Sequence, residues 1–292
     1  MACGTAETMN LRAISDLHLA SQANRDALLA LPSFGDDWLI VAGDVAERLD
    51  HVRLAFEALT QRFGRVFWVP GNHDLWAIPH EPDRPALAGE PRYRALVKLA
   101  RDHGVVTPED PYQTWPGAGG PCIIAPLFLL YDYSFRPAHI DRAGVIDWAR
   151  EEGAVCADEM FLDPAPWPTR DAWCDNRIAE TEQRLGQIEA GMATVLVNHF
   201  PLRGDLIHIP RAPRFTPWCG TRRTDDWHRR YNARVVVSGH LHVRRTDWRD
   251  GTRFEEVSFG YPRQWDQSRG MAPYLRTILP TPHDDQAANP RR

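Results

Sequence analysis

Five apolar runs of this sequence each end in residues that could bind a metal ion or carry a proton. The five endings are Asp16-Leu17-His18, Gly43-Asp44, Gly71-Asn72-His73-Asp74, Asn198-His199 and Gly239-His240-Leu241-His242. The preceding runs are rich in β-branched and aromatic side chains, which indicates buried strands over residues 11–15, 38–42, 65–69, 194–197 and 234–237. Charged and amide side chains are rarely buried unless they are paired or bind a metal. Because ligands of open α/β sheets bind beyond the carboxyl ends of strands, we expect the five endings to form one site.

The residue types at these endings are typical of a site for a pair of transition-metal ions. The candidate ligands are Asp16, His18, Asp44, Asn72, His199, His240 and His242. This mixture of oxygen and imidazole ligands favours Mn, Fe, Co or Zn over Ca or Mg, and the absence of cysteine argues against a structural zinc site. Asp16 and His18 face the same way on an extended segment and could bind one ion together. Asp44 offers two oxygens that could bridge two ions, although Gly43-Asp44 alone fits a turn before a helix equally well.

Two such ions would perform phosphoryl chemistry. Ions about 3.5–4 Å apart activate a bridging hydroxide and clamp the attacking and leaving oxygens of a phosphoryl displacement. His73 stands beside a candidate ligand but is itself free to donate a proton to the leaving oxygen. The sequence therefore predicts a metal-dependent hydrolase of phosphoric esters.

Helices must return the chain between these strands. Apolar spacing predicts helices over residues 24–31, 47–62, 92–102, 169–191 and 225–231. Residues 105–106 and 122–125 are further strand candidates, Asp250-Gly251 predicts a hairpin, and residues 78–91 and 115–121 read as a loop and a turn. The sequence has no internal repeat and no break in composition. We expect one domain over residues 1–285, followed by a disordered tail at 286–292.

Composition excludes several classes of protein. The chain has 292 residues, of which 43% are hydrophobic and 25% charged, as in an ordinary globular protein. Its net charge of −5 provides no basic field for nucleic acid or a membrane surface, and no run is long enough to span a bilayer. The five cysteines lack paired zinc-site spacing, and no signal peptide is present, which predicts a cytoplasmic protein with reduced thiols. No oligomeric state follows from the sequence.

Two other segments allow two interpretations each. Residues 126–137 are too apolar for a free loop; they could wall one side of the site, or form an inner strand or packed loop with no ligand role. Residues 203–245 are rich in arginine, interleaved with aromatic residues. These arginines could steer an acidic partner, or form a solvated face paired with neighbours such as Asp225, Asp226 and Asp247.

The five endings resemble, in the same order, the five motif blocks of the calcineurin-like metallophosphoesterases. The resemblance covers most of the chain and implies a two-sheet β-sandwich flanked by helices, in four layers α/β/β/α, with the metals at the strand ends. By position, it implies that one metal takes Asp16, His18, Asp44 and His242, and that the other takes Asp44, Asn72, His199 and His240. Asp44 would bridge them, and His73 would be the acid or the transition-state donor.

Three nearby residues have less certain roles. Glu47-Arg48 falls where protein phosphatases of this superfamily carry Asp-Arg, so that Glu47 would orient His73 and Arg48 would touch phosphate. The glycine expected next is Leu49, which weakens the match, and Glu47 fits a solvated helix start equally well. Asp74, the last residue of the third ending, is a candidate for contact with phosphate or for support of the ligands.

Four further segments resemble the bacterial phosphopantetheinyl hydrolases, which cleave the phosphopantetheine arm from acyl carrier proteins. These segments are residues 108–111, 125–135, 218–221 and 254–258. The implied partner is an acidic acyl carrier protein, and the implied cofactors are two Mn, Fe or Zn ions, with Mn expected to serve in vitro. A small-molecule phosphatase or cyclic-nucleotide phosphodiesterase would use the same metals. A nuclease would need a basic groove, and a non-catalytic scaffold tends to lose ligands or His73, all of which are present here.

Overall fold

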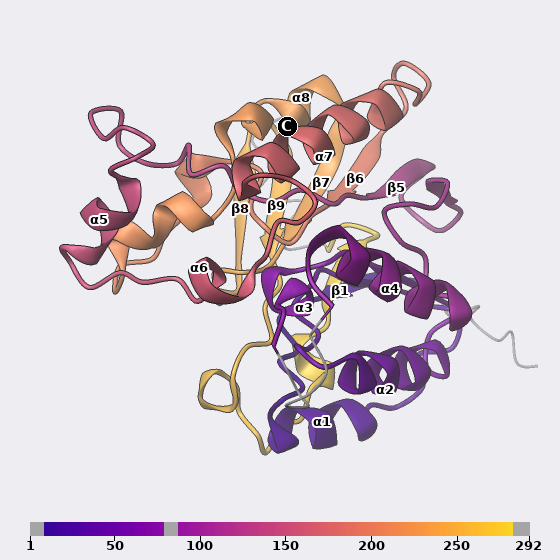
Figure 1. Cartoon of the computed structure of the whole chain (residues 1–292). Helices are drawn as coiled ribbons and strands as arrows, with labels where there is room; N and C mark the ends of the chain where they lie inside the picture. The colour runs from indigo at the N-terminus through magenta and orange to yellow at the C-terminus, as the bar shows by residue number, and fades with distance from the viewer. Residues whose placement is uncertain (1–8, 79–86, 283–292) are drawn as a thin grey trace, which may run out of the picture.

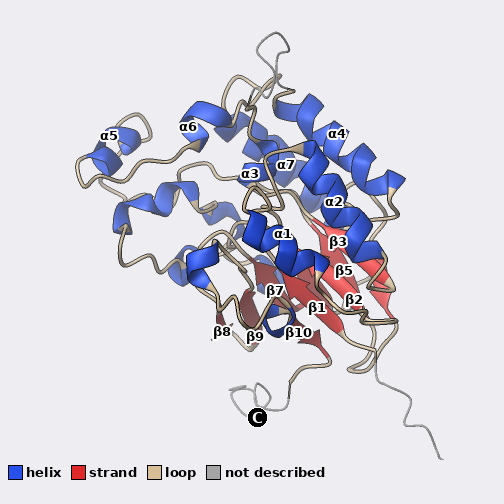
Figure 2. Ribbon diagram, turned by 90° about the horizontal axis from the view of Figure 1, so that it is seen from below, coloured by secondary structure: helices blue, strands red, loops and turns tan. Residues whose placement is uncertain are grey.

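Two β-sheets pack face to face, and helices cover the outer face of each sheet (Figures 1 and 2). The computed structural model describes residues 9–78 and 87–282. This arrangement is the four-layer α/β/β/α sandwich that the resemblance implied. The predicted tail at 286–292 and most of the predicted loop at 78–91 lie outside the described residues.

The first sheet carries three of the five endings. Its strands are β1 (Leu11–Ile14), β2 (Trp38–Val41), β3 (Arg65–Trp68) and β10 (Arg276–Leu279). Their order is β10-β1-β2-β3, and β1, β2 and β3 are parallel, with Ile14 opposite Val41 and Val41 opposite Trp68. This register places the three carboxyl ends level at one edge. The antiparallel strand β10 was not predicted, because its short apolar run stands alone between polar residues and prolines.

The second sheet carries the other two endings. Its strands are β4 (Gln113–Trp115), β5 (Cys122–Pro126), β6 (Thr194–Val197), β7 (Ala233–Ser238), β8 (Arg245–Arg249) and β9 (Thr252–Glu256). Their order is β4-β5-β6-β7-β9-β8; the middle four strands are parallel and the two edge strands are antiparallel. The hairpin of β8 and β9 turns at Asp250-Gly251, as predicted.

The helices form the two outer layers. They are α1 (Gln22–Leu29), α2 (Leu49–Thr60), α3 (Asn72–Leu75), α4 (Gly89–Asp102), α5 (Val145–Arg150), α6 (Asp158–Phe161), α7 (Arg170–Leu185) and α8 (Trp227–Arg230). Helices α1, α2 and α4 cover the first sheet, and α7 and α8 cover the second (Figure 1). Among the described residues, every helix is too short or too polar to cross a membrane.

The apolar core follows the alternation of the strands. One set of side chains fills the space between the sheets and includes Ile40, Val69, Val197 and Val237. The residues between them along each strand point outward beneath the helices, as Val41 does. Strands buried on both faces read as continuous apolar runs, which is why they stand out so clearly in the sequence.

Several boundaries differ from those predicted. Helix α4 begins at Gly89, within the predicted loop, because Pro91 is tolerated in a first turn. Helix α7 ends at Leu185 instead of 191, since Gly186 follows and the chain turns there. Residues 105–106 form no strand; Val106 makes only an isolated bridge to Phe67. Strand β4 was missed, because the predicted turn already began at its last residue.

The two segments that allowed two interpretations are residues 126–137 and 203–245. The first is held in place by packing, and many arginines of the second form ion pairs. After Pro126 the apolar segment continues as a packed loop in which residues 127–131 are buried. Many of the arginines between 203 and 245 are paired, as in Arg203–Asp205, Arg214–Glu151 and Arg223–Asp175. Some of these arginines pair with carboxylates that are close in sequence, as expected. Others, such as Arg214 and Arg223, pair with carboxylates of distant segments.

Candidate metal centre

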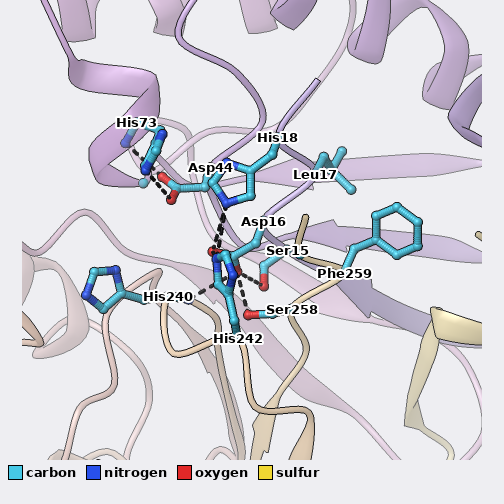
Figure 3. Close-up of polar contacts among 12 residues, drawn as sticks. Ser15, Asp16, Leu17, His18, Asp44, His73, His240, His242, Ser258 and Phe259 are labelled. Atoms are coloured by element: carbon cyan, nitrogen blue, oxygen red, sulfur yellow. Dashed lines mark hydrogen bonds and ion pairs between the residues drawn. The ribbon is translucent and has the colours of Figure 1, made fainter. Parts of the chain in front are cut away.

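The structure brings all five endings to one place, where the edges of the two sheets meet. The end of β1 is joined to the segment after β9 by hydrogen bonds from Ser15 N to Val257 O (3.1 Å) and from Phe259 N to Ser15 O (2.8 Å). The bond from Asp16 N to Gly43 O (2.9 Å) joins the first two endings. The candidate ligands therefore converge from both sheets, and Figure 3 shows Asp16, His18, Asp44, His240 and His242 around one centre.

One group of ligand atoms surrounds the carboxylate of Asp16. The Nε2 atom of His242 lies 3.0 Å from Asp16 Oδ1 and 3.1 Å from Nε2 of His18. The other oxygen, Oδ2, accepts hydrogen bonds from the hydroxyls of Ser15 (2.6 Å) and Ser258 (2.7 Å). One carboxylate oxygen is thus held by the protein, and the other is turned toward the two imidazoles.

A second group surrounds Asp44. The Nε2 atom of His199 lies 3.4 Å from Asp44 Oδ2 and 3.2 Å from Asn72 Oδ1. The remaining oxygen, Asp44 Oδ1, accepts the backbone N–H of His73 (2.8 Å). The ring of His240 lies 5.2 Å from the ring of His199, between centroids.

The donor set fits a pair of ions. The Nδ1 atom of His199 lies 2.8 Å from Ala42 O, and that of His242 lies 2.8 Å from Gln264 Oε1. These acceptors hold one proton on Nδ1, so that a metal ion would only have to replace the proton on Nε2 to bind each ring through that atom. The Nε2 of His240 is buried and has no hydrogen-bond partner among the described residues. A buried nitrogen without a partner, close to carboxylates and other imidazoles, is typical of a metal ligand.

The backbone is strained at five of the seven candidate ligands. Their φ angles are 54° at Asp16, 43° at His18, 53° at Asp44, 72° at His240 and 55° at His242. Non-glycine residues rarely adopt this left-handed region, and a cluster of them is typical of functional sites.

Two glycines allow the ligands to lie this close to neighbouring backbone. A Cβ atom at Gly71 would lie 2.1 Å from Asp44 Oδ1, and one at Gly239 would lie 2.3 Å from Asp16 Oδ2. Both contacts are impossible, so only glycine fits at these positions.

The electrostatics of the site separate the histidines into two kinds. Burial opposes the charged form of every ring, but Asp44 outweighs burial at His199 and raises its pKa to about 10. Asp16 does the same at His242 and raises its pKa to about 9. Burial dominates at His240 and at His18, whose pKa values fall to about 3 and about 4, with His199 and His73 adding to the respective decreases. The two aspartates hold cationic partners in a buried place, which is the charge balance that bound cations would replace.

His73 lies at the side of the site and does not belong to either group of ligands. Its Nδ1 lies 2.7 Å from Glu47 Oε1, and its Nε2 lies 4.0 Å from Asp44 Oδ2. Its ring stacks on Trp76 at 3.6 Å. Burial lowers the pKa of His73, but Asp44 and Glu47 outweigh burial and raise the pKa above its ordinary value. The side chain is 14% exposed, so the free nitrogen can reach a bound molecule.

Two further candidates near His73, Asp74 and Arg48, have other contacts. Asp74 is buried and accepts the backbone N–H groups of Val45 (2.8 Å), Ala46 (3.1 Å) and Gly71 (3.0 Å). It therefore joins the loops after β2 and β3 and has no exposed oxygen for phosphate. Arg48 is half exposed and bound to Asp50, with Nη2 and Oδ2 2.6 Å apart.

Several residues that contact the ligands were missed by sequence reasoning. Ser15, Ser258 and Gln264 hold Asp16 and His242, Tyr261 stacks on His18 at 4.3 Å, and Asp158 contacts Asn72. Ser258 follows strand β9, so its position as a polar residue just after a strand could have indicated a place at the site. Tyr261 and Gln264 flank and end a single 3-10 turn, and Asp158 opens the one-turn helix α6; segments this short have no periodicity or spacing that indicates a role.

Comparison with known proteins identifies the family. The family model described as calcineurin-like phosphoesterase matches residues 9–244. The chain belongs to the calcineurin-like phosphoesterases. It is therefore a metal-dependent hydrolase of phosphoric esters, as the five endings predicted.

Two of the matches come from Mycobacterium tuberculosis. The acyl-carrier-protein phosphodiesterase PptH of Mycobacterium tuberculosis is 51% identical over 274 residues, which are 93% of this chain and 84% of that protein. The crystal structure of phosphopantetheinyl hydrolase (PptH) from M. tuberculosis matches with a TM-score of 0.87 at 49% identity, over 94% of this chain and 97% of that chain. The fold is thus shared along nearly the whole chain, and the narrower resemblance of the sequence points to the same proteins.

Proposed function

We propose that this phosphoesterase is a phosphodiesterase that releases the phosphopantetheine arm from an acidic acyl carrier protein. The observation that carries this substrate is the 51% identity to a protein named for that activity, over 93% of the chain. The same level of identity supports a single domain over residues 1–285.

We infer that Asp16, His18, Asp44 and His242 would hold one divalent ion, and Asp44, Asn72, His199 and His240 the other. Two sets of residues support this assignment: Asp16, His18 and His242 bring ligand atoms within 4.8 Å of one another, and so do Asp16, Asp44 and His199. When bound, such ions polarise the phosphate and supply an activated water as nucleophile. Mn²⁺ is the ion we propose for assays, and Fe and Zn suit the same ligands.

The protein's own contribution is to exclude water from the ligands and to move one proton. The carboxylates of Asp16 and Asp44 are almost completely buried, so charges near them interact strongly. Glu47 holds the Nδ1–H of His73 and directs Nε2 toward the centre. A serine alkoxide is a poor leaving group, and a protonated His73 can donate to it. His73, His240 and His242 are the partly exposed histidines of the site, with 14% of the His73 side chain and 16% of the His242 side chain exposed, and they mark where the substrate enters.

A mass-spectrometric assay tests this function. Purified enzyme is treated with chelator, reloaded with Mn²⁺ and mixed with holo acyl carrier protein. We expect the carrier protein to lose its arm and regain an unmodified serine, and the chelated enzyme to be inactive until Mn²⁺ is added. Hydrolysis of bis-p-nitrophenyl phosphate without release of the arm would refute the carrier-protein substrate. Turnover of free cyclic nucleotides or phosphomonoesters would then favour a small-molecule enzyme.

A further inference from the structure

A buried carboxylate outside the five endings contacts one of the candidate ligands. Asp158 opens the short helix α6, and its side chain has no exposed surface. Its Oδ1 accepts hydrogen bonds from Nδ2 of Asn72 at 2.9 Å and from Nε1 of Trp76 at 2.7 Å. Asn72 and Asp158 are 86 residues apart in the chain. Only the tertiary structure brings them together.

This contact decides which end of the Asn72 amide faces the ligands. Oδ1 of Asp158 acts as an acceptor, since it also takes the indole N–H of Trp76, whereas an asparagine amide has one accepting and one donating end. Asp158 therefore attracts the NH₂ group of Asn72 and leaves Oδ1 on the opposite side, 3.2 Å from Nε2 of His199. A flipped amide would present N–H groups to a cation, which cannot coordinate through them.

Helix α6 is fastened so that Asp158 keeps its place. Arg170 donates to Asp158 O at 2.6 Å and to Leu162 O at 2.9 Å, and it pairs with Glu159 at 3.0 Å. The other oxygen of Glu159 accepts the hydroxyl of Tyr133 at 2.8 Å and Nε1 of Trp218 at 2.8 Å. Tyr133 belongs to the apolar segment 126–137 and Trp218 to the arginine-rich segment 203–245, so these two segments meet at helix α6. Their packing holds the turn that carries Asp158.

We propose that Asp158 is a positioning residue, which orients Asn72 so that the carboxamide oxygen binds the ion shared with Asp44, His199 and His240. The proposal rests on the metal centre of the proposed function but not on its substrate. Partners that orient metal ligands typically contribute about 10–100-fold to metal affinity. Loss of the acceptor at Asp158 should weaken one ion of the pair by a factor of that order.

The affinity of the protein for metal ions tests this role of Asp158 independently of catalysis. Asp158→Leu keeps the branched shape of the side chain and removes both acceptor oxygens. Asp158→Asn keeps an oxygen that can accept from Asn72 and Trp76. Asp163→Asn changes an exposed acid on the same segment, whose oxygen accepts only the backbone N–H of Ala165, and is the matched control. Each metal-free protein is titrated with Mn²⁺ by calorimetry, and bound metal per chain is determined by mass spectrometry.

We expect Asp158→Leu to keep one ion and to bind the second about 10–100-fold more weakly, whereas Asp158→Asn and Asp163→Asn stay within a few-fold of wild type. Two ions at wild-type affinity in Asp158→Leu would overturn the proposal. An equal loss in Asp158→Asn would also overturn it, because the carboxylate charge would then matter and not the acceptor. Wild type that binds two ions but leaves the carrier protein intact would refute only the substrate.

A second pair of variants applies if Asp158→Leu does not fold, as judged by the circular dichroism of the metal-free protein. Asn72→Asp replaces the amide with a carboxylate that faces Asp158 and is repelled by it. Adding Asp158→Asn to that variant supplies a donor to the new carboxylate. We expect the double variant to bind the second ion more tightly than Asn72→Asp alone. Equal or weaker binding in the double variant would overturn the proposal.

Discussion

Replacing Glu47 with glutamine should change how the enzyme depends on pH. The carboxylate of Glu47 lies 2.7 Å from Nδ1 of His73 and is itself largely buried, with a side chain that is 16% exposed. Burial raises the pKa of Glu47, but the hydrogen bond and charge of His73 outweigh burial and lower it, so the acid stays ionised. In Glu47→Gln the side-chain oxygen can still accept from Nδ1–H, and only the negative charge is lost.

The size of the change in the pKa of His73 follows from its hydrogen bond with Glu47. A bond to a charged group contributes about 1.5–3 kcal/mol, and one pKa unit corresponds to about 1.4 kcal/mol. The neutral bond that Glu47→Gln retains still contributes about 0.5–1.5 kcal/mol, so loss of the charge alone should lower the pKa of His73 by about one unit. When cations neutralise Asp44, Glu47 remains the chief anion that faces His73, so its charge matters most in the loaded enzyme.

The sign of the effect is defined by the role of His73. If the protonated ring donates to the leaving oxygen, the rate falls as pH rises through the His73 pKa. A lower pKa in Glu47→Gln then moves this alkaline decline to lower pH. We expect the alkaline decline of kcat for an alkyl phosphodiester to shift by about one pH unit. For a bis-nitrophenyl ester we expect a smaller change, because nitrophenolate leaves without a proton.

The control is Asp50→Asn, which changes an exposed acid of the same helix start that pairs with Arg48. Its profile should match wild type. Metal content is measured in parallel, since Glu47 is not assigned to an ion. An unshifted alkaline decline in Glu47→Gln with both metals bound would show that His73 does not act as the acid. A loss of metal would show that Glu47 supports a ligand.

Three further outcomes are expected. His73→Ala should lower turnover of an alkyl phosphodiester by roughly 10²–10⁴-fold, and of a nitrophenyl ester much less, with both metals retained in elemental analysis; equal losses would exclude proton donation. Asp44→Asn should abolish turnover and weaken both ions in Mn²⁺ titrations, because an amide cannot replace a bridging charge, and two tightly bound ions would contradict the bridge. Arg177, against the opposing effect of burial, lowers the pKa of Glu109 to about 2. In urea titrations at neutral pH, the free energy of unfolding of Glu109→Gln should therefore be about 3 kcal/mol lower than that of wild type. This difference should vanish as the pH falls from about 4.5 to about 2. A difference that persists at low pH would refute the role of the Glu109 charge.

The sequence by itself determined the five strands that carry the endings, and the chemistry of those endings. Strands buried on both faces must be continuous apolar runs, and parallel strands must place their carboxyl ends at one edge, so local pattern and spacing were sufficient. Seven candidate ligands and His73 could be named for the same reason, because a polar side chain at the end of a buried strand needs a partner or an ion to stay there. The resemblance of these blocks to a family added the division of the ligands between two ions.

The tertiary structure alone decided what holds those ligands. Asp158, Gln264 and Tyr261 come from single helical turns, and their contacts with Asn72, His242 and His18 have no local pattern. A hydrogen bond across 86 residues depends on how whole layers pack, and hydrophobic periodicity carries no information about it. The same holds for Asp74, which directly follows His73 in the sequence and yet accepts hydrogen bonds from the backbone of another loop. Sequence names side chains that can do chemistry, but the direction in which each one points is set by packing among elements that are distant in the chain.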